Sequence, residues 1–114
     1  MQSEIQSSRN DVLPGTLQML ILKTLTRGPL HGYAIAQQIK LTSADVLQVE
    51  EGSLYPALQR MLLKGWVTAK WMPAGPKRRA RVYQLTPAGR KQLADEVSGF
   101  TRVMEATLRV IQPA

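Results

Sequence analysis

Residues 52–65 read Gly-Ser-Leu-Tyr-Pro-Ala-Leu-Gln-Arg-Met-Leu-Leu-Lys-Gly, and the interpretation of the whole chain depends on this stretch. Its apolar residues recur at the spacing of one helical face, which predicts an amphipathic helix with a buried stripe formed by Leu54, Leu58, Met61 and Leu62. The other face carries hydroxyls, an amide and two cations, which can bond to phosphates and to base edges. Its residues are Ser53, Tyr55, Pro56, Gln59, Arg60 and Lys64. Taken alone, the stretch favours an ordinary helix with a solvated polar face.

The ends of this predicted helix are marked by small residues. Gly52 and Ser53 are both suitable N-caps, and either one keeps Pro56 in the first turn, where a proline is tolerated. Gly65 is a suitable stop, because glycine adopts the left-handed conformation that ends many helices. We therefore expect a helix that begins near Gly52 and ends before Gly65.

The distribution of charge indicates a polyanionic partner. The net charge is +7 and the isoelectric point is about 10.3. Residues 52–94 contain no Asp or Glu, whereas Lys and Arg recur throughout them. A block of one sign within a folded segment is typical of nucleic-acid binding. An acidic protein partner and a generally basic surface are the alternatives.

Composition limits the other functional classes. The 114 residues suit one domain, or a small domain with an attached helix. The absence of cysteine excludes disulfides and thiolate zinc sites, and it fits a reducing compartment. The single histidine, His31, is expected to cap a helix or join the core rather than to bind a metal. No base is evident beside a nucleophile, so we expect no enzyme activity, no catalytic residue, no metal and no cofactor.

A membrane location is not expected. The most apolar run, residues 17–25, is interrupted by Gln18 and Lys23 and is far shorter than the roughly 20 residues that a bilayer span needs. No targeting segment is visible in the polar N-terminal stretch. We expect a soluble, cytoplasmic protein with no membrane partner.

The first predicted helix has an unusually wide apolar surface. Residues 1–13 are polar and suggest a flexible arm, or a helix that only a partner would order. Pro14 or Thr16 then begins the first predicted helix. Its main stripe contains Leu17, Leu20 and Ile21, and further apolar residues extend it over more than half of the circumference. Such a helix packs against two partners, so we expect one side to face the core and the other to face a second subunit.

A second, shorter helix is predicted after the Gly-Pro pair at residues 28–29. Tyr33 lies near its start, and its ring is either part of the core or a phosphate contact. Residues 41–51 then form a connector, which we expect Val46, Leu47 and Val49 to anchor to the core.

After the central helix the pattern changes to that of a β-hairpin. Residues 66–71 and 82–85 are β-prone, and a loop rich in Pro and Gly separates them. The tip and the returning strand carry Lys77, Arg78, Arg79 and Arg81. Cations on such a hairpin can reach a duplex backbone or a minor groove. A merely solvated charged loop is the alternative, but the neighbouring helix favours nucleic acid.

The last predicted helix begins with Thr86 as N-cap and Pro87 in its first position. Its apolar residues approximate the spacing of a coiled-coil seam: Leu93, Val97, Phe100, Met104, Leu108 and Ile111. Gly99 would let another backbone approach closely. A helix of about 25 residues reaches roughly 37 Å, longer than a small domain can cover. A second copy of the chain is the simplest cover, and a heterologous partner is the alternative.

Together these elements predict a mainly α fold with a small β-hairpin: a winged helix-turn-helix followed by a long C-terminal dimerisation helix. The expected boundaries are an arm at residues 1–13, a DNA-binding domain at residues 14–85 and the dimerisation helix at residues 86–114. The third helix would enter the major groove of double-stranded DNA, with the wing on its flank.

Five motifs in order resemble the PadR family of bacterial transcriptional regulators. They are Leu-Pro-Gly-Thr-Leu at 13–17, Gly-Pro-Leu-His-Gly-Tyr at 28–33, Gly-Ser-Leu-Tyr-Pro-Ala-Leu at 52–58, Gly-Trp at 65–66 and Arg-Val-Tyr-Gln-Leu-Thr-Pro-Ala-Gly at 81–89. The resemblance extends over about residues 13–111. With one C-terminal helix, the chain is similar to the short branch of the family, which leaves less room for an effector domain.

The resemblance implies a homodimer held by its first and last helices on a pseudo-palindromic operator, usually as a repressor. It places DNA contacts at Tyr33, Ser53, Tyr55, Gln59, Arg60 and Lys64, with the wing at residues 77–81. It also implies that a small aromatic or drug-like effector, bound near the dimer interface, releases the DNA. Two other interpretations stay open: a protein-interaction module that uses the C-terminal seam, and an architectural DNA binder without sequence preference.

Overall fold

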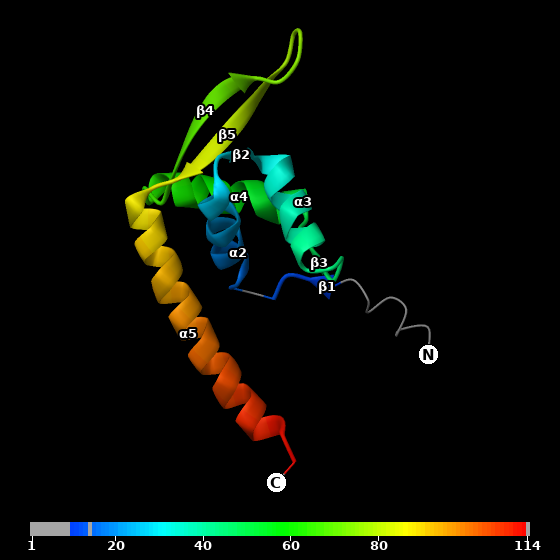
Figure 1. Ribbon diagram of the computed structural model, residues 1–114, viewed down its shortest axis with the longest axis vertical. Helices are drawn as coiled ribbons and strands as arrows, with labels where there is room; N and C mark the ends of the chain where they lie inside the picture. Colours follow the sequence, from blue (N-terminus) through cyan, green and yellow to red (C-terminus); the bar gives the residue numbers. More distant parts are fainter. Residues whose placement is uncertain (1–9, 14, 114) are drawn as a thin grey trace.

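The computed structural model describes residues 10–13 and 15–113 and shows a helical body with two projections (Figure 1). The α-helices of these residues are α2 (Leu17–Thr24), α3 (Gly32–Thr42), α4 (Glu51–Leu63) and α5 (Pro87–Ile111), and a short 3-10 helix, η1 (Leu25–Arg27), follows α2. The β-hairpin of residues 67–85, which we call the wing, projects at one end and α5 at the other, so the longest dimension reaches 59 Å. None of these helices has both the length and the apolar character needed to cross a bilayer.

Two small sheets connect the helices. The three-stranded sheet has the antiparallel order β2 (Leu30–His31), β5 (Arg79–Leu85) and β4 (Val67–Pro73). The other sheet pairs β1 (Asn10–Asp11) in parallel with β3 (Leu47–Gln48). Asn10 and Asp11 therefore belong to a strand and not to the flexible arm that we expected. The remainder of that arm, residues 1–9, lies outside the described residues.

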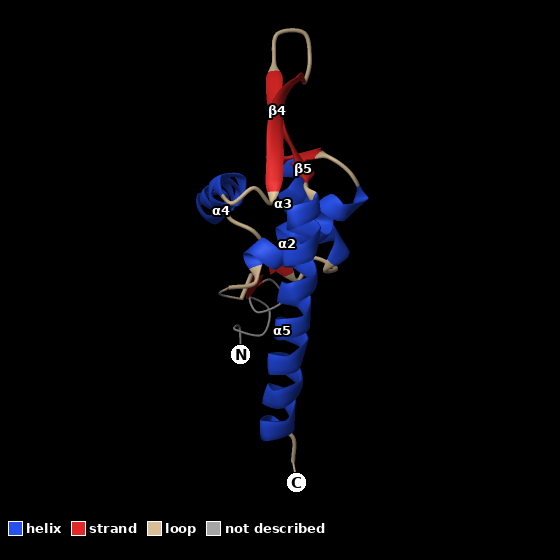
Figure 2. Ribbon diagram, turned by 90° about the vertical axis from the view of Figure 1, so that its left-hand side faces the viewer, coloured by secondary structure: helices blue, strands red, loops and turns tan. Residues whose placement is uncertain are grey.

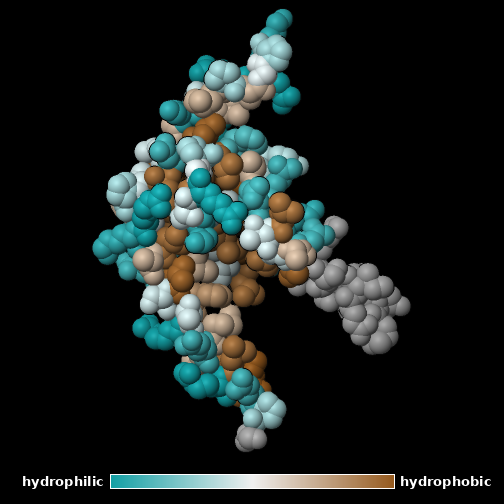
Figure 3. Space-filling view, in the orientation of Figure 1, coloured by the Kyte–Doolittle hydropathy of each residue, from teal (hydrophilic) through white to brown (hydrophobic). Residues whose placement is uncertain are grey.

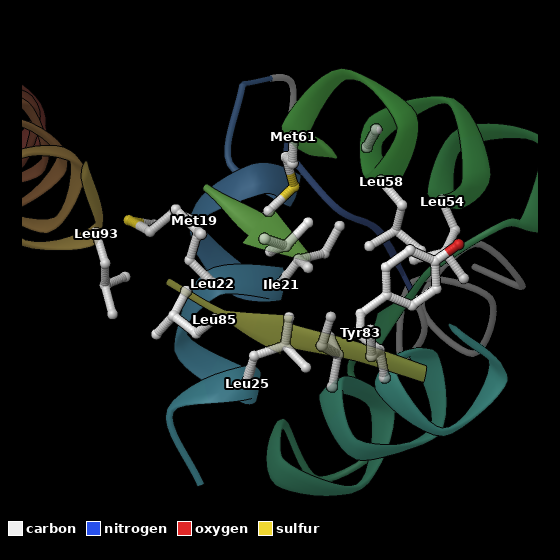
Figure 4. Packing of buried hydrophobic residues seen from close by; sticks show 14 residues of the cluster. Met19, Ile21, Leu22, Leu25, Leu54, Leu58, Met61, Tyr83, Leu85 and Leu93 are labelled. Carbon is white, nitrogen blue, oxygen red and sulfur yellow. The ribbon is translucent and has the colours of Figure 1, made fainter. Parts of the chain in front are cut away.

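The core lies where α2, α3 and α4 meet the base of the three-stranded sheet (Figure 4). The stripe predicted for α4 is confirmed: Leu54, Leu58 and Met61 are buried and Leu62 is half-buried. The other fully buried large side chains are Ile21, Leu22, Leu25, Ile35 and Val67. Burial of this stripe fixes the rotation of α4 and leaves its polar face outward.

The start of α4 differs from the sequence-based expectation. Glu50 is the N-cap, and its carbonyl accepts hydrogen bonds from the N–H groups of Ser53 and Leu54 at 3.0 and 2.9 Å. Pro56 therefore lies inside the helix and not in its first turn, so it cannot donate to the carbonyl of Gly52. Both residues are exposed, and water can reach that carbonyl instead.

The end of α4 is as predicted. Gly65 has a φ of +77°, the left-handed conformation expected of a C′ glycine. Its N–H donates to the carbonyl of Leu62, and the N–H of Trp66 donates to that of Met61, which together form a Schellman motif. The chain thus turns directly from α4 into β4.

The connector before α4 is shorter than expected, because α3 continues to Thr42. A turn follows in which Ala44 and Asp45 both have positive φ. Leu47 and Val49 are half-buried as expected, but Val46 is 43% exposed and does not anchor the segment. The pairing of β3 with β1 supplies an attachment that the sequence did not reveal.

Helix α5 begins as predicted, with the hydroxyl of Thr86 accepting from the N–H of Gly89 at 3.0 Å. Its first half packs on α2, where the side-chain amide of Gln18 donates to Glu96. The second half extends away from the body (Figures 1 and 2). Several of its apolar side chains, namely Val103, Leu108, Val110 and Ile111, are therefore exposed, and hydrophobic surface gathers on one side of this part of α5 (Figure 3).

His31 caps α3, because its Nδ1 accepts from the N–H of Ala34 at 3.3 Å. Replacing this acceptor leaves a helix N–H without a partner, which typically costs about 1 kcal/mol. We expect His31→Ala to lower the free energy of unfolding by about that amount in urea titrations, while His31→Asn retains most of it because asparagine is a good N-cap. Equal stability of the wild-type protein and His31→Ala would contradict a capping role.

Candidate nucleic-acid interface

The polar face predicted for α4 is on the surface. The six residues expected there are all exposed: Ser53, Tyr55, Pro56, Gln59, Arg60 and Lys64. Figure 2 shows α4 standing out to one side of the body, while α2 and α3 lie nearer its middle. A helix held in this way by its buried stripe can insert its outer face into a groove without any unfolding.

Tyr55 is oriented by a contact with α3. A Cβ atom added at Gly32 would lie only 2.7 Å from Cε1 of the Tyr55 ring, so the absence of a side chain at Gly32 makes room for this ring. Partial burial, followed by the negative charge of Glu51 and then by Tyr83, raises the pKa of Tyr55. Its hydroxyl therefore stays protonated near neutral pH and can donate a hydrogen bond. Sequence reasoning missed Gly32, for which a small residue at a helix start was the only signal.

Tyr33 lies at the surface and not in the core, since the residue is 55% exposed. It borders a surface groove on the outer side of α3, together with Gln37, Lys40 and Gln48. Of the two roles considered for Tyr33, the core role is therefore wrong. A contact of Tyr33 with phosphate remains a prediction.

The wing is longer than the sequence indicated. Pairing continues outward through Trp71–Arg81 and Met72–Ala80 to Pro73–Arg79, so two of the cations lie on β5 and not in the loop. All four predicted wing cations are exposed: Lys77, Arg78, Arg79 and Arg81. Within the described residues none of them forms an ion pair, which leaves their charge available to an anion.

A cation also lies where α4 passes into the wing. The Nζ atom of Lys64, the C-cap of α4, lies 5.2 Å from the centre of the Trp66 ring. Lys64 thus extends the positive charge of the α4 face to the point where the chain enters β4. No described group of three or more His, Cys, Asp or Glu side chains could hold a metal ion.

The residues expected at a dimer interface divide into two groups. Val97, Leu108 and Ile111 on α5 are exposed. Four others are half-buried: Leu17, Leu20, Phe100 and Met104. Ile21 and Leu93, in contrast, are buried in the core of the single chain. The expectation for these two requires correction, because a side chain enclosed by its own domain has no surface for a second subunit. At Gly99, no neighbouring group lies within 4 Å of an added Cβ.

Three helices, the third with an exposed polar face, and a cationic two-stranded wing define the winged helix-turn-helix class of DNA-binding domain. Residues 21–95 match the model of the transcriptional regulator PadR-like family. The chain belongs to this family, whose members are transcription regulators and not enzymes.

Two individual relatives are similar to most of this chain. The chain is 43% identical over 86 residues to a transposon-encoded 37.1 kDa protein of Streptomyces fradiae. The matched segment covers 75% of this chain and 23% of that protein. It is 29% identical over 79 residues to the negative transcriptional regulator PadR of Bacillus subtilis, covering 69% of this chain and 43% of that one.

A solved structure shows a similar fold. Bacillus subtilis PadR in complex with operator DNA superposes with a TM-score of 0.67 at 28% identity, covering 73% of this chain and 47% of that one. The chain thus spans less than half of the length of both of these proteins.

Proposed function

We propose that this protein is a sequence-specific transcriptional repressor that binds a pseudo-palindromic operator as a homodimer. The observation that carries this proposal is the exposed polar face of α4 beside a wing whose cations have no ion-pair partner in the described chain. The names of the relatives support it, since Bacillus subtilis PadR is a negative regulator and has been crystallised with operator DNA.

In this proposal α4 enters the major groove and reads base edges through Ser53, Tyr55, Gln59 and Arg60. Arginine donates two hydrogen bonds to guanine, and glutamine pairs in a similar way with adenine. Tyr33, Lys64 and the four wing cations contact the phosphate backbone and supply affinity that falls with salt. Repression follows because an occupied promoter excludes RNA polymerase.

The dimer is proposed to form through α5 and the outer side of α2. A two-fold axis places the two α4 helices about 34 Å apart, one turn of DNA, which accounts for two inverted half-sites. The exposed apolar residues of the second half of α5 give a reason for the contact. We further propose that a small aromatic or drug-like effector binds near this interface and releases the DNA. The proposed location is the cytoplasm.

The decisive experiment is selection from a pool of random duplexes at about 150 mM salt, within the range where non-specific binding weakens. Enrichment of a motif with two inverted halves is the expected result. Retention without enrichment would instead identify an architectural DNA binder. No retention would favour a protein-interaction module that uses the second half of α5.

Arg60 is the strongest candidate for reading a base, because a guanidinium can donate two parallel hydrogen bonds to guanine. We expect Arg60→Ala to relax the preference at one base pair of the selected operator by about 1–3 kcal/mol. Binding constants for the operator and its single-base variants measure this difference. An equal loss for every sequence would show that Arg60 contacts only phosphate.

Arg78, in the turn of the wing, is expected to contact phosphate alone. Arg78→Ala should weaken binding almost uniformly across sequences and lower the slope of log K against log salt by about one, since one fewer counterion is released. Titrations of the operator at several salt concentrations test this. Arg102→Ala, on the exposed surface of α5, serves as the control, and an unchanged slope for Arg78→Ala would remove the wing turn from the interface.

A further inference from the structure

The outer part of the wing carries a tryptophan that the core does not use. Trp71 on β4 is 56% exposed and takes no part in the core cluster. Its partner across the hairpin is Arg81, whose Cζ atom lies 5.9 Å from the centre of the indole ring. Directly paired residues project to the same face of a sheet, so the strand register itself brings the guanidinium over the ring.

This pair lies on the face of the sheet that is turned toward the helices. One pair nearer the body on the same face are Ala69 and Tyr83. Tyr83 is buried in the core together with Leu54 of α4, and its ring points toward α4 in Figure 4. The Trp71–Arg81 pair thus continues outward from the surface where α4 meets the sheet.

The opposite face of the outer wing has a different character. It carries Lys70 and Met72 on β4, paired with Val82 and Ala80 on β5. Only one cation is present there, whereas Arg79 and Arg81 lie with Trp71 on the other face. Because α4 packs on this face of the sheet, the outer face of α4 and the Trp71 face of the outer wing are turned in the same direction. A duplex that contacts the exposed face of α4 would therefore meet the guanidiniums of Arg79 and Arg81.

Stacking on a ring changes what an arginine can do. A free, exposed arginine samples many rotamers and loses that freedom when it binds a phosphate. An aromatic ring occupies the flat face of the guanidinium and leaves its N–H edge free to donate to phosphate oxygens. Part of the ordering therefore takes place before the DNA arrives, which strengthens binding without any added contact.

We propose that Trp71 is a positioning residue for DNA binding: its ring holds the Arg81 guanidinium ready for the phosphate backbone, and the wing meets the duplex with its Trp71 face and not with its Lys70 face. This inference rests on the proposed function. It assigns a role to Trp71 that does not require the ring itself to touch DNA.

A double-mutant cycle on the selected operator tests the proposal. Trp71→Ala and Trp71→Leu should each weaken binding about 2- to 5-fold, the effect of an exposed cation–π pair, while Trp71→Phe retains most of the affinity. Arg81→Ala should weaken binding more and lower the salt slope by about one, because it removes the charge. The double variant Trp71→Ala/Arg81→Ala should bind as Arg81→Ala alone does, since Trp71 acts only through Arg81.

Two further measurements separate positioning from a structural role. Met72→Ala, next to Trp71 on the opposite face, should leave both affinity and salt slope unchanged. Every wing variant should stay folded, with a Tm only a few degrees below that of the wild-type protein, because the Trp71–Arg81 pair lies outside the core. In the free protein, the NMR signal of the Arg81 Hε should be displaced by the indole ring current and should return to its ordinary position in Trp71→Ala.

The contrary results are equally definite. Additive losses in the double variant would show that Trp71 contacts DNA on its own account, and unchanged affinity of Trp71→Ala or an unmoved Arg81 signal would show no positioning. A loss in Met72→Ala equal to that in Trp71→Ala would overturn the choice of face. If the wild-type protein binds no duplex, the proposed function and this inference both fail. If the wild-type protein and Trp71→Ala bind equally well, only this inference fails.

Discussion

Gly89→Ala is expected to destabilise this protein more than any other alanine substitution at a glycine. A Cβ atom at this position would lie 2.1 Å from the backbone carbonyl oxygen of Trp66, far inside any allowed contact. That carbonyl cannot move freely, because it accepts the N–H of Thr86 at 3.1 Å and so ties the start of α5 to the start of β4. Overpacking against a fixed backbone costs about 3 kcal/mol, and the junction of wing, body and α5 must shift.

Gly99→Ala is the matched control, since Gly99 lies in the same helix with open space around an added methyl group. Alanine is favoured over glycine inside a helix by about 0.5–1 kcal/mol, so this variant should be slightly more stable. Thermal unfolding measures both, and the loss at Gly89 corresponds to a fall in Tm of roughly 12 °C or more at about 4 °C per kcal/mol. A Tm for Gly89→Ala within a degree or two of the wild-type value would contradict the contact with Trp66.

The parts of the fold that sequence alone predicted are those with strong local signals. The stripe of α4 was recognised because four apolar residues repeat at helical spacing, and burial of that stripe placed the polar face outward without further information. The start of α5 was recognised from Thr86 and Pro87, whose chemistry suits a helix N-terminus. The wing followed from a change of period on either side of a loop rich in Pro and Gly.

The features that escaped prediction depend on distant segments. Two-residue strands such as β1 and β3 are too short to show any period, so their pairing leaves no sequence pattern. The space that Gly32 leaves for the ring of Tyr55 exists only because α3 and α4 cross there. The sequence predicts a dimer surface for Ile21 because α2 is apolar over most of its circumference, and only the packing shows which side faces its own core.

The start of α4 shows a different limit of sequence reasoning. Gly52 and Ser53 are good N-cap residues, and a proline usually marks a first turn, so both signals favoured a later start. The chain instead begins the helix at Glu51 and accepts Pro56 in its interior, where the lost hydrogen bond faces solvent. Because this shifts only the first turn, the positions of Gln59 and Arg60 on the outer face are unaffected.

Leu108→Glu is expected to have the largest effect on operator binding. Leu108 is 44% exposed on the part of α5 that extends beyond the body, where the proposed dimer would cover it. A carboxylate buried there without a partner opposes association by several kcal/mol, so a dimer should give way to a monomer at micromolar concentration. The monomer should remain folded, because Leu108 contributes nothing to the core of the single chain.

Loss of the dimer removes one of two linked DNA contacts. Each monomer then binds one half-site independently. The increase in affinity that comes from linking the two contacts, about 100-fold or more, is lost. Ala106→Glu is the control. Arg102, Ala106 and Arg109 stand at i, i+4 and i+7 on the polar side of the same helix. The same negative charge at residue 106 should therefore change neither the mass of the dimer in solution nor its affinity for the operator. Sedimentation and operator titration of both variants provide the measurement. If Leu108→Glu stays dimeric and binds the operator at full strength, the subunits meet elsewhere and α5 is free for another partner.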